Sequence, residues 1–283
     1  MTEGIVANQL VVGGIAVVAG GSSGIGRAAV ECLAENGAAV EFFSFDASAN
    51  EEVAAKLVAQ GFDVRGSTVD VASPVEVRTF FEEVARRRGR VSALVNSVGI
   101  QRYGTAETTS IETWDEVIDV NLRGMFLTVK YAVPLMRLNG GGSIINVSSG
   151  QAVASQQNVV AYTASKGAIV AMTRAMAVDY APENIRVNSV CPGSVDTPML
   201  RASAFSIDPD NPDGVIAEWG RGHPLGRVGQ PREIADTILF LASHLSSFVT
   251  GADLRVDGGV LAGIALAAPS DASDAGRQCS VEP

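Results

Sequence analysis

Cysteine and histidine are scarce in this chain of 283 residues. The three cysteines, Cys32, Cys191 and Cys279, are odd in number and far apart, and no C-x-x-C pair is present. They provide neither a disulfide framework nor a paired-cysteine metal motif, which favours a reducing, cytoplasmic setting. We interpret the two histidines, His223 and His244, as a polar loop residue and a partner of a helix C-terminus. Neither comes with a Cys/His/Asp cluster, so we expect no metal.

Positive charge is also in short supply. Lys and Arg total 21 and Asp and Glu total 31, which gives a net charge of −10. An acidic surface repels phosphate backbones and anionic lipid, so we expect no nucleic-acid partner and no membrane partner. The charge-free run at residues 4–26 is long, but no positive region precedes it and it ends in a polar glycine cluster. A buried parallel strand followed by a glycine loop fits this run better.

Apolar residues make up 47% of the chain, which is enough for a sizeable core. Short apolar runs typical of strands alternate seven times with segments of helical period. Because parallel neighbouring strands need crossover helices, this alternation predicts an α/β fold with helices on both faces of a parallel sheet. No composition shift marks a linker, so we expect a single domain over residues 1–283. Its core would span about 12–260, and 261–283 would form a C-terminal extension.

Glycines gather at the first strand-to-helix junction. Gly20, Gly24 and Gly26 follow an apolar run at residues 15–19 and precede a segment of helical period. Glycine lets the backbone approach a pyrophosphate, and the N-terminus of the helix offers free N–H groups and a positive partial charge. A tight turn without a ligand is the alternative, but the placement favours nucleotide binding.

Three further polar residues form a pattern with this loop. Tyr162 and Lys166 are four residues apart in an expected helix, so they share one face. Ser149 comes just after an expected strand at residues 143–147, and the carboxyl ends of parallel strands are where ligands bind. A Tyr-x-x-x-Lys pair alone is common by chance. Its combination with the glycine loop and the serine at a strand end is specific.

With these motifs the sequence resembles the short-chain dehydrogenase/reductase family, in its branch of compact single-domain oxidoreductases. The likeness covers residues 15–259 and includes Ala-Gly-Gly-Ser-Ser-Gly-Ile-Gly at 19–26, Asn-Ser-Val-Gly at 96–99, Tyr-Thr-Ala-Ser-Lys at 162–166 and Arg-Val-Asn-Ser-Val-Cys-Pro-Gly at 186–193. The resemblance implies a Rossmann-type doubly wound sheet of about seven parallel strands, NAD(P)-dependent chemistry and a homotetramer.

The resemblance also implies roles for individual residues. Asn121, Ser149, Tyr162 and Lys166 would form the catalytic tetrad. The cofactor would be bound by the glycine loop and by the ends of later strands, through Gly20, Ser22, Ser23, Gly24, Ile25, Gly26, Asp70, Val71, Asn96, Gly99, Tyr162, Lys166, Pro192, Gly193, Val195 and Thr197. Three departures from the family pattern, Ala19, Ser97 and Val98, would weaken cofactor affinity without touching a proton-transfer residue.

The expected chemistry needs a base for a hydroxyl proton. Tyrosine, with a pKa near 10, is a poor base at neutral pH, and lowering that pKa by about three units takes roughly 4 kcal/mol. One ammonium at about 4 Å supplies an interaction of that size at an effective dielectric constant of about 20. We therefore expect Lys166 to lower the pKa of Tyr162. By resemblance, Ser149 would bind the substrate oxygen, and Asn121 would hold a water that links Lys166 to solvent.

Charge at the end of the second strand bears on the choice of cofactor. The family's NADP users tend to carry Arg or Lys there, whereas this chain has Phe-Ser-Phe-Asp at 43–46 and Ser22-Ser23 in the loop. Asp46 would repel a 2′-phosphate, so we predict that it contributes to binding NAD and that NADP is disfavoured. The alternative is that Asp46 merely caps the following helix.

The alternation breaks between residues 194 and 227, a stretch rich in Pro, Asp and Gly. Its prolines exclude one continuous helix, yet it carries apolar residues such as Phe205 and Trp219 that a solvated loop would not need. We predict a mobile substrate lid; the alternative is a helix pair packed permanently on the core. The substrate pocket would be formed by this segment, residues 100–103 and residues 151–158, with Gln151, Phe205 and Trp219 touching the substrate.

The predicted function is hydride transfer between NAD(H) and a secondary alcohol or ketone, with a small molecule as the only partner besides further copies of the chain. A non-catalytic nucleotide-binding or sensor protein on the same fold is one alternative, and an NADP-dependent ketoreductase is another. A sugar-nucleotide epimerase or dehydratase also shares Tyr-x-x-x-Lys. The stretch 194–227 is too short for the larger substrate lobe of such enzymes.

Overall fold

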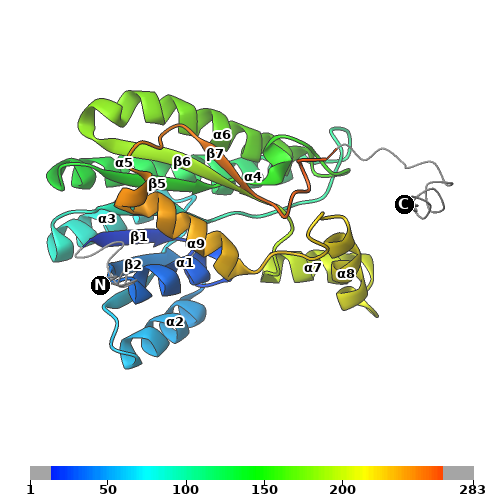
Figure 1. The fold of residues 1–283 in the computed structure, drawn as a ribbon, viewed down its shortest axis with the longest axis horizontal. Coiled ribbons are helices and arrows are strands. Elements are labelled where there is room, and N and C mark those ends of the chain that lie inside the picture. Colours follow the sequence, from blue (N-terminus) through cyan, green and yellow to red (C-terminus); the bar gives the residue numbers. More distant parts are fainter. Residues whose placement is uncertain (1–13, 264–283) are drawn as a thin grey trace, which may run out of the picture.

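A computed structural model describes residues 14–263 of the chain (Figure 1). Cys279 and nearly all of the expected C-terminal extension lie outside the described residues. Seven strands form one parallel sheet in the order β3-β2-β1-β4-β5-β6-β7, which confirms the predicted doubly wound sheet. In chain order the strands are β1 (Ile15–Ala19), β2 (Ala39–Ser44), β3 (Val64–Thr68), β4 (Ala93–Asn96), β5 (Gly142–Val147), β6 (Ile185–Pro192) and β7 (Asp253–Val256).

Helices cover both faces of the sheet. They are α1 (Gly24–Glu35), α2 (Ala47–Ala59), α3 (Pro74–Arg88), α4 (Ile111–Ile118), α5 (Gly124–Leu138), α6 (Val160–Tyr180), α7 (Pro198–Ile207), α8 (Pro212–Arg221) and α9 (Pro231–Ala242). One buried cluster packs α1, α2 and α9 on one face, and a second packs α3, α5 and α6 on the other. Strand β1 serves both clusters, because Ala16 and Val18 face one and Val17 and Ala19 face the other.

The sheet order places a switch point between β1 and β4. Strand β1 pairs with β2 on one side and with β4 on the other, so the crossovers that follow these two strands leave in opposite directions. A crevice opens at such a point outside the carboxyl ends of the strands. The fold thus positions the glycine loop after β1 next to the chain that leaves β4.

The segment from 194 to 227 is more regular than its sequence predicts. It contains the ten-residue helices α7 and α8, which pack against each other to the side of the sheet (Figure 1). Pro198 and Pro212 stand in the first turns of these helices, where the missing N–H has no helical partner to lose. Thr197 and Asn211 cap the two helices with side-chain oxygens. The prolines therefore start two separate helices, and no continuous helix spans the segment, as the sequence predicts.

Membrane insertion has no candidate segment in the part of the chain that the structure describes. Between residues 14 and 263, no helix combines the length and the hydropathy needed to cross a bilayer. The run of residues from 15 to 26 is instead divided between strand β1, a turn and the start of α1, all within the sheet and its first crossover.

Candidate active site

A cavity of about 890 Å³ lies at the carboxyl edge of the sheet. It is lined by the glycine loop after β1 and by residues that follow β2, β4, β5 and β6, so it occupies the switch point of the fold. Its volume lies toward the upper end of the range for small-molecule sites. The strand ends converge here because all seven strands are parallel and finish at the same edge.

The glycine loop has the shape of an anion cradle. Gly20 and Gly24 have φ angles of +82° and +52°, which other residues rarely adopt. A Cβ atom on Gly26 would lie 2.0 Å from the carbonyl oxygen of Gly20, so no side chain fits there. Ser23 begins α1 without a side-chain capping bond, and no acidic residue stands in the first turn. The free N–H groups of this turn fit the diphosphate of a dinucleotide.

The second strand contributes neutral groups to the cavity. Ser44, at the end of β2, accepts a hydrogen bond from Ser22 Oγ at 2.8 Å and donates one to Asn50 Oδ1 at 2.8 Å. Asp46, predicted to contact the cofactor, is exposed and does not line the cavity. Its carboxylate accepts from the Ala49 N–H at 3.0 Å and caps α2. Asp46 therefore caps α2, as the alternative expects, and its contribution to binding NAD stays a prediction.

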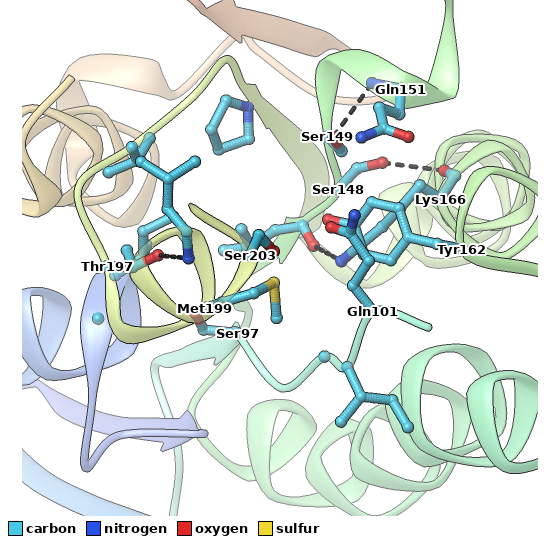
Figure 2. A pocket seen from close by; sticks show the side chains of 18 of the residues that line it. Ser97, Gln101, Ser148, Ser149, Gln151, Tyr162, Lys166, Thr197, Met199 and Ser203 are labelled. Carbon is cyan, nitrogen blue, oxygen red and sulfur yellow. Dashed lines mark hydrogen bonds between the residues drawn. The ribbon is translucent and has the colours of Figure 1, made fainter. Parts of the chain in front are cut away.

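Tyr162 and Lys166 meet Ser149 at one wall of the cavity (Figure 2). Helix α6 places the tyrosine and the lysine one turn apart, and both are buried. Lys166 Nζ donates to the Val147 carbonyl at 3.0 Å and lies 5.4 Å from the centre of the Tyr162 ring. Ser149 follows β5 and accepts a hydrogen bond from the Gln151 N–H at 3.1 Å. Strand β5 and helix α6 therefore assemble the trio expected from the sequence.

Burial is the main cause of the pKa shifts of Tyr162 and Lys166. It raises the pKa of Tyr162 to about 12, while a hydrogen bond with Ser149 acts in the opposite direction. Burial also lowers the pKa of Lys166 to about 8. Contrary to the expectation that it would be lowered, the pKa of Tyr162 is raised, because burial removes water from the phenol and outweighs the hydrogen bond with Ser149. The phenol is thus a proton donor at neutral pH.

Asn121 is buried and is not among the residues that line the cavity. It lies in a π-helical turn, Asp119–Arg123, that separates α4 from α5. Its Oδ1 accepts from the Ile100 N–H at 2.8 Å, and its Nδ2 donates to the Ile100 carbonyl at 2.9 Å and to Ser165 Oγ at 3.0 Å. The amide therefore fixes the chain that leaves β4 and connects it to α6, the helix of Tyr162 and Lys166.

Most of the predicted site residues come together at the cavity. Those that line it are Gly20, Ser22, Ser23, Gly24, Ile25, Asp70, Val71, Gly99, Ser149, Gln151, Tyr162, Lys166, Pro192, Gly193, Val195, Thr197 and Trp219. Gly26, Asp46, Asn96, Asn121 and Phe205 are not among its lining residues. Asn96 is buried and bonds to Asn146 and Thr128, whereas Phe205 on α7 is 58% exposed.

Other lining residues carry weaker sequence signals. The predicted segment 100–103 lines the cavity throughout, and the segment 151–158 does so in part. Helix α7 adds Met199, Leu200 and Ser203, whose helical spacing is short and bounded by prolines. His223, interpreted from the sequence as a polar loop residue, is buried and lines the cavity. Nothing in its sequence neighbourhood indicates this, because its burial depends on packing between distant segments.

A doubly wound sheet with a glycine loop at its switch point and a buried Tyr–Lys pair beside it defines a class, the dinucleotide-dependent oxidoreductases. A family model described as enoyl-(acyl carrier protein) reductase matches residues 19–261. Cyclohexanol dehydrogenase of Acinetobacter sp. (strain SE19) is 35% identical over 245 residues, which cover 86% of this chain and 93% of that enzyme. The chain belongs to the short-chain dehydrogenase/reductase family.

Solved structures agree with this membership. Ligand-free aldohexose dehydrogenase of Thermoplasma acidophilum superposes with a TM-score of 0.84 at 36% identity, over 91% of this chain and 98% of that one. Levodione reductase gives a TM-score of 0.85 at 31% identity, over 89% and 99%. The protein is an NAD(P)-dependent short-chain dehydrogenase or reductase that acts on alcohols or ketones.

Proposed function

We propose that the protein transfers a hydride between NAD(H) and a secondary alcohol or ketone, with Asn121, Ser149, Tyr162 and Lys166 as its functional residues. One observation carries this proposal: buried Tyr162 and Lys166 line the same cavity as the glycine loop and Ser149. A nicotinamide cofactor, when bound, supplies or accepts the hydride. The experiment is an absorbance assay at the NADH band with a panel of secondary alcohols and ketones.

The chain's own residues handle the proton and the substrate oxygen. In ketone reduction the Tyr162 phenol, protonated at neutral pH, donates its proton to the substrate oxygen. The Ser149 hydroxyl donates to the same oxygen and stabilises the negative charge that develops on it. Lys166 is protonated below about pH 8, and its ammonium favours the phenolate that remains. Asn121 positions residues 99–100 and the helix that carries the pair.

Electrostatics of the lining support NAD over NADP. The side chains at the end of β2 are neutral, and Ser22 and Ser44 bond to each other. Lys166 and Arg102 are the cations that line the cavity; Lys166 lies by Tyr162, and Arg102 is paired with Glu116 at 2.6 Å. A 2′-phosphate would therefore have no free cation to pair with among these residues. We expect a higher kcat/KM with NAD than with NADP, and the reverse order would contradict this assignment.

The substrate end of the cavity favours an uncharged ring or a hydroxylated molecule. Gln101, Gln151 and Ser203 present amide and hydroxyl groups near Tyr162 and Ser149, and Met199 adds an apolar contact (Figure 2). The similar proteins include a cyclohexanol dehydrogenase and an aldohexose dehydrogenase, whose names specify a cyclic alcohol and a sugar. The assay panel should contain cyclic alcohols, aldoses and an acyl thioester, and we expect the first two groups to be turned over fastest.

We also propose that α7 and α8 move as a lid. Met199 and Leu200 on α7 and Trp219 on α8 line the cavity, so closure of these helices would exclude water from the reaction. Hydrogen exchange of the apo enzyme and of a ternary complex tests this. We expect added protection of residues 198–221 in the complex. Equal, strong protection in both states would favour a permanent helix pair.

We propose that the protein forms a homotetramer. Phe126 on α5 and Val178 on α6 are large apolar side chains that the single chain leaves exposed. Contact with further copies would cover them, because α5 and α6 pack on the same face of the sheet. Light scattering at micromolar concentration should give the mass of four chains, and a monomer mass would contradict the proposal.

A further inference from the structure

His223 connects two walls of the cavity, the chain that leaves β6 and the C-terminal end of α8. It is 5% exposed, although its neighbours Gly222 and Pro224 are exposed. Its ring lines the cavity together with Gly193 and Trp219. Burial of a single loop residue between exposed neighbours indicates that the side chain has a specific place in the interior.

Both ring nitrogens of His223 are engaged. The backbone N–H of Ser194 donates to Nε2 at 3.1 Å, and Nδ1 lies 2.9 Å from the carbonyl oxygen of Trp219. Because a carbonyl can only accept, the hydrogen must be on Nδ1, which leaves Nε2 as the acceptor that Ser194 needs. The ring is therefore neutral, and each nitrogen has a partner of the right kind.

The two partners belong to different parts of the site. Ser194 follows Gly193 in the chain that leaves β6, and a Cβ atom on Gly193 would lie 2.8 Å from Nε2, so the ring packs directly on that backbone. Trp219 is in the last turn of α8, and its carbonyl accepts from the Gly222 N–H at 3.1 Å as well as facing Nδ1. Trp219 also lines the cavity, on the side of the proposed lid.

We propose that His223 is a positioning residue that holds the chain after β6 and the C-terminal end of α8 in register, so that the cofactor wall and the substrate wall are set by one side chain. This inference rests on the proposed function, in which residues 192–197 bind the nicotinamide end. The bond to Ser194 then supports binding of the cofactor, and the bond to Trp219 supports binding of the substrate. Loss of one bond should therefore weaken the binding of one ligand more than that of the other.

Two amide variants separate the two bonds. In His223→Asn the amide nitrogen can still reach the Trp219 carbonyl, but the acceptor for Ser194 is lost. We expect the dissociation constant of NADH to rise about tenfold, with a change of less than about threefold in the KM of the alcohol or ketone. In His223→Gln the amide oxygen can replace Nε2 while the bond to Trp219 is lost, so the two effects should be exchanged.

The control is His244→Asn. His244 is the other histidine of the chain and is exposed in a short 3₁₀ helix after α9, so this variant should change neither constant. A purely structural role for His223 would lower the melting temperature and alter both constants to the same extent in both variants, and that result would overturn the inference. A wild-type protein that binds no nicotinamide dinucleotide would instead overturn the proposed function.

A measurement on the wild type avoids any dependence on variants that fold poorly. Long-range ¹H–¹⁵N NMR of protein labelled at its two histidines reports which ring nitrogen carries the hydrogen. We expect one ring to be locked with the hydrogen on Nδ1, and this signal to be absent in His223→Gln. A ring with the hydrogen on Nε2, or with averaged tautomers, would overturn the inference because Ser194 would then lack its acceptor.

Discussion

Between residues 14 and 263, two charged side chains are buried, and their surroundings differ. Glu41, in the middle of β2, is 0% exposed and receives hydrogen bonds from Arg87 and Arg88 at 2.8 Å each. Lys166, on α6, is 4% exposed, and its ammonium donates to the neutral carbonyl of Val147. The first charge is neutralised by two guanidinium groups, whereas the second has no carboxylate partner among the described residues.

The locations explain the difference. Arg87 and Arg88 end α3, where cations also interact favourably with the helix dipole, and Arg88 extends the network to Asp63 at 2.7 Å. Hydrogen bonds to Asp63 and Glu41 raise the pKa of Arg88. Lys166 lies at the wall of the cavity instead, beside Tyr162. A buried unpaired charge is unfavourable for stability, and such groups gather where chemistry needs them.

The largest expected effect is on turnover, and it follows from a change at the cavity wall that holds Tyr162 and Lys166. In Tyr162→Phe only the phenol oxygen is lost, so the cavity keeps its shape while the proton donor disappears. We expect kcat to fall by about 10²–10⁴-fold, the usual contribution of general acid–base catalysis, with NADH binding retained. Steady-state kinetics and a fluorescence titration with NADH test this. A variant that keeps more than a few per cent of wild-type activity would show that the unpaired lysine does not serve this phenol.

The next effect concerns the paired charge. Glu41→Gln leaves two guanidinium groups beside a neutral amide in the core, and breaking a buried ion pair in this way costs about 3–5 kcal/mol of unfolding free energy. Urea denaturation measures the loss. Activity per folded molecule should not change, because Glu41 is not among the residues that line the cavity.

Glu83→Gln is the matched control for this variant. Glu83 bonds to the same Arg87 at 2.9 Å, but it lies on the exposed side of α3. Its removal should change stability far less than Glu41→Gln does, because water solvates the partners of an exposed pair. If Glu41→Gln and Glu83→Gln are equally stable, burial does not account for the contribution of Glu41 to the free energy of unfolding.

Replacing Lys166 should stabilise the fold, whereas replacing Glu41 should destabilise it. A pKa lowered from 10.5 to about 8 means that the unfolded chain binds the proton more tightly, so the buried ammonium destabilises the fold by about 3 kcal/mol below pH 8. Lys166→Met should recover part of this, less about 1 kcal/mol for the lost bond to Val147, while abolishing most activity. We expect the variant to be more stable than the wild type at pH 7.

The pH dependence provides the check. Between about pH 8 and 10.5 the folded wild type has lost its proton and the unfolded chain has not, so wild-type stability rises through this window and its gap to Lys166→Met closes. The raised pKa of Tyr162 makes stability fall above pH 10 in both proteins alike. Denaturation curves at pH 7 and pH 9.5 decide it; a gap that does not change with pH would contradict the assignment.

Much of this site was predictable because its pattern is local. Ser149 comes two residues after β5, and Tyr162 and Lys166 are one helical turn apart. Spacing places the pair on one helix face and the serine at a strand end, and the family resemblance implies that they act together. The glycine loop is equally local, since Gly20, Gly24 and Gly26 each meet a steric limit in a single strand–turn–helix unit. The alternation of strands and helices predicts a parallel sheet with helices on both faces, and the family resemblance implies its doubly wound form.

What the sequence could not predict depends on packing. Asp46 and Ser44 differ by two positions, and only the three-dimensional course of the chain after β2 shows that Ser44 lines the cavity while Asp46 caps α2. The pKa of Tyr162 follows from burial, which spacing to Lys166 does not reveal. His223 is held by two backbone groups from segments 4 and 29 residues away.

The smallest effect is expected where a charge pair is exposed, and it completes the comparison. Arg102 bonds to Glu116 through two contacts, at 2.6 and 3.0 Å, with both side chains nearly half exposed at the mouth of the cavity. Water solvates each partner when the pair is broken, so a double-mutant cycle of Arg102→Gln and Glu116→Gln should give a coupling of about 0.2–1 kcal/mol. In 1 M salt, where the Debye length is about 3 Å, the coupling should shrink further. A coupling as large as the loss in Glu41→Gln, or one that resists salt, would mean that pairing geometry and not burial sets the energy of charges in this fold.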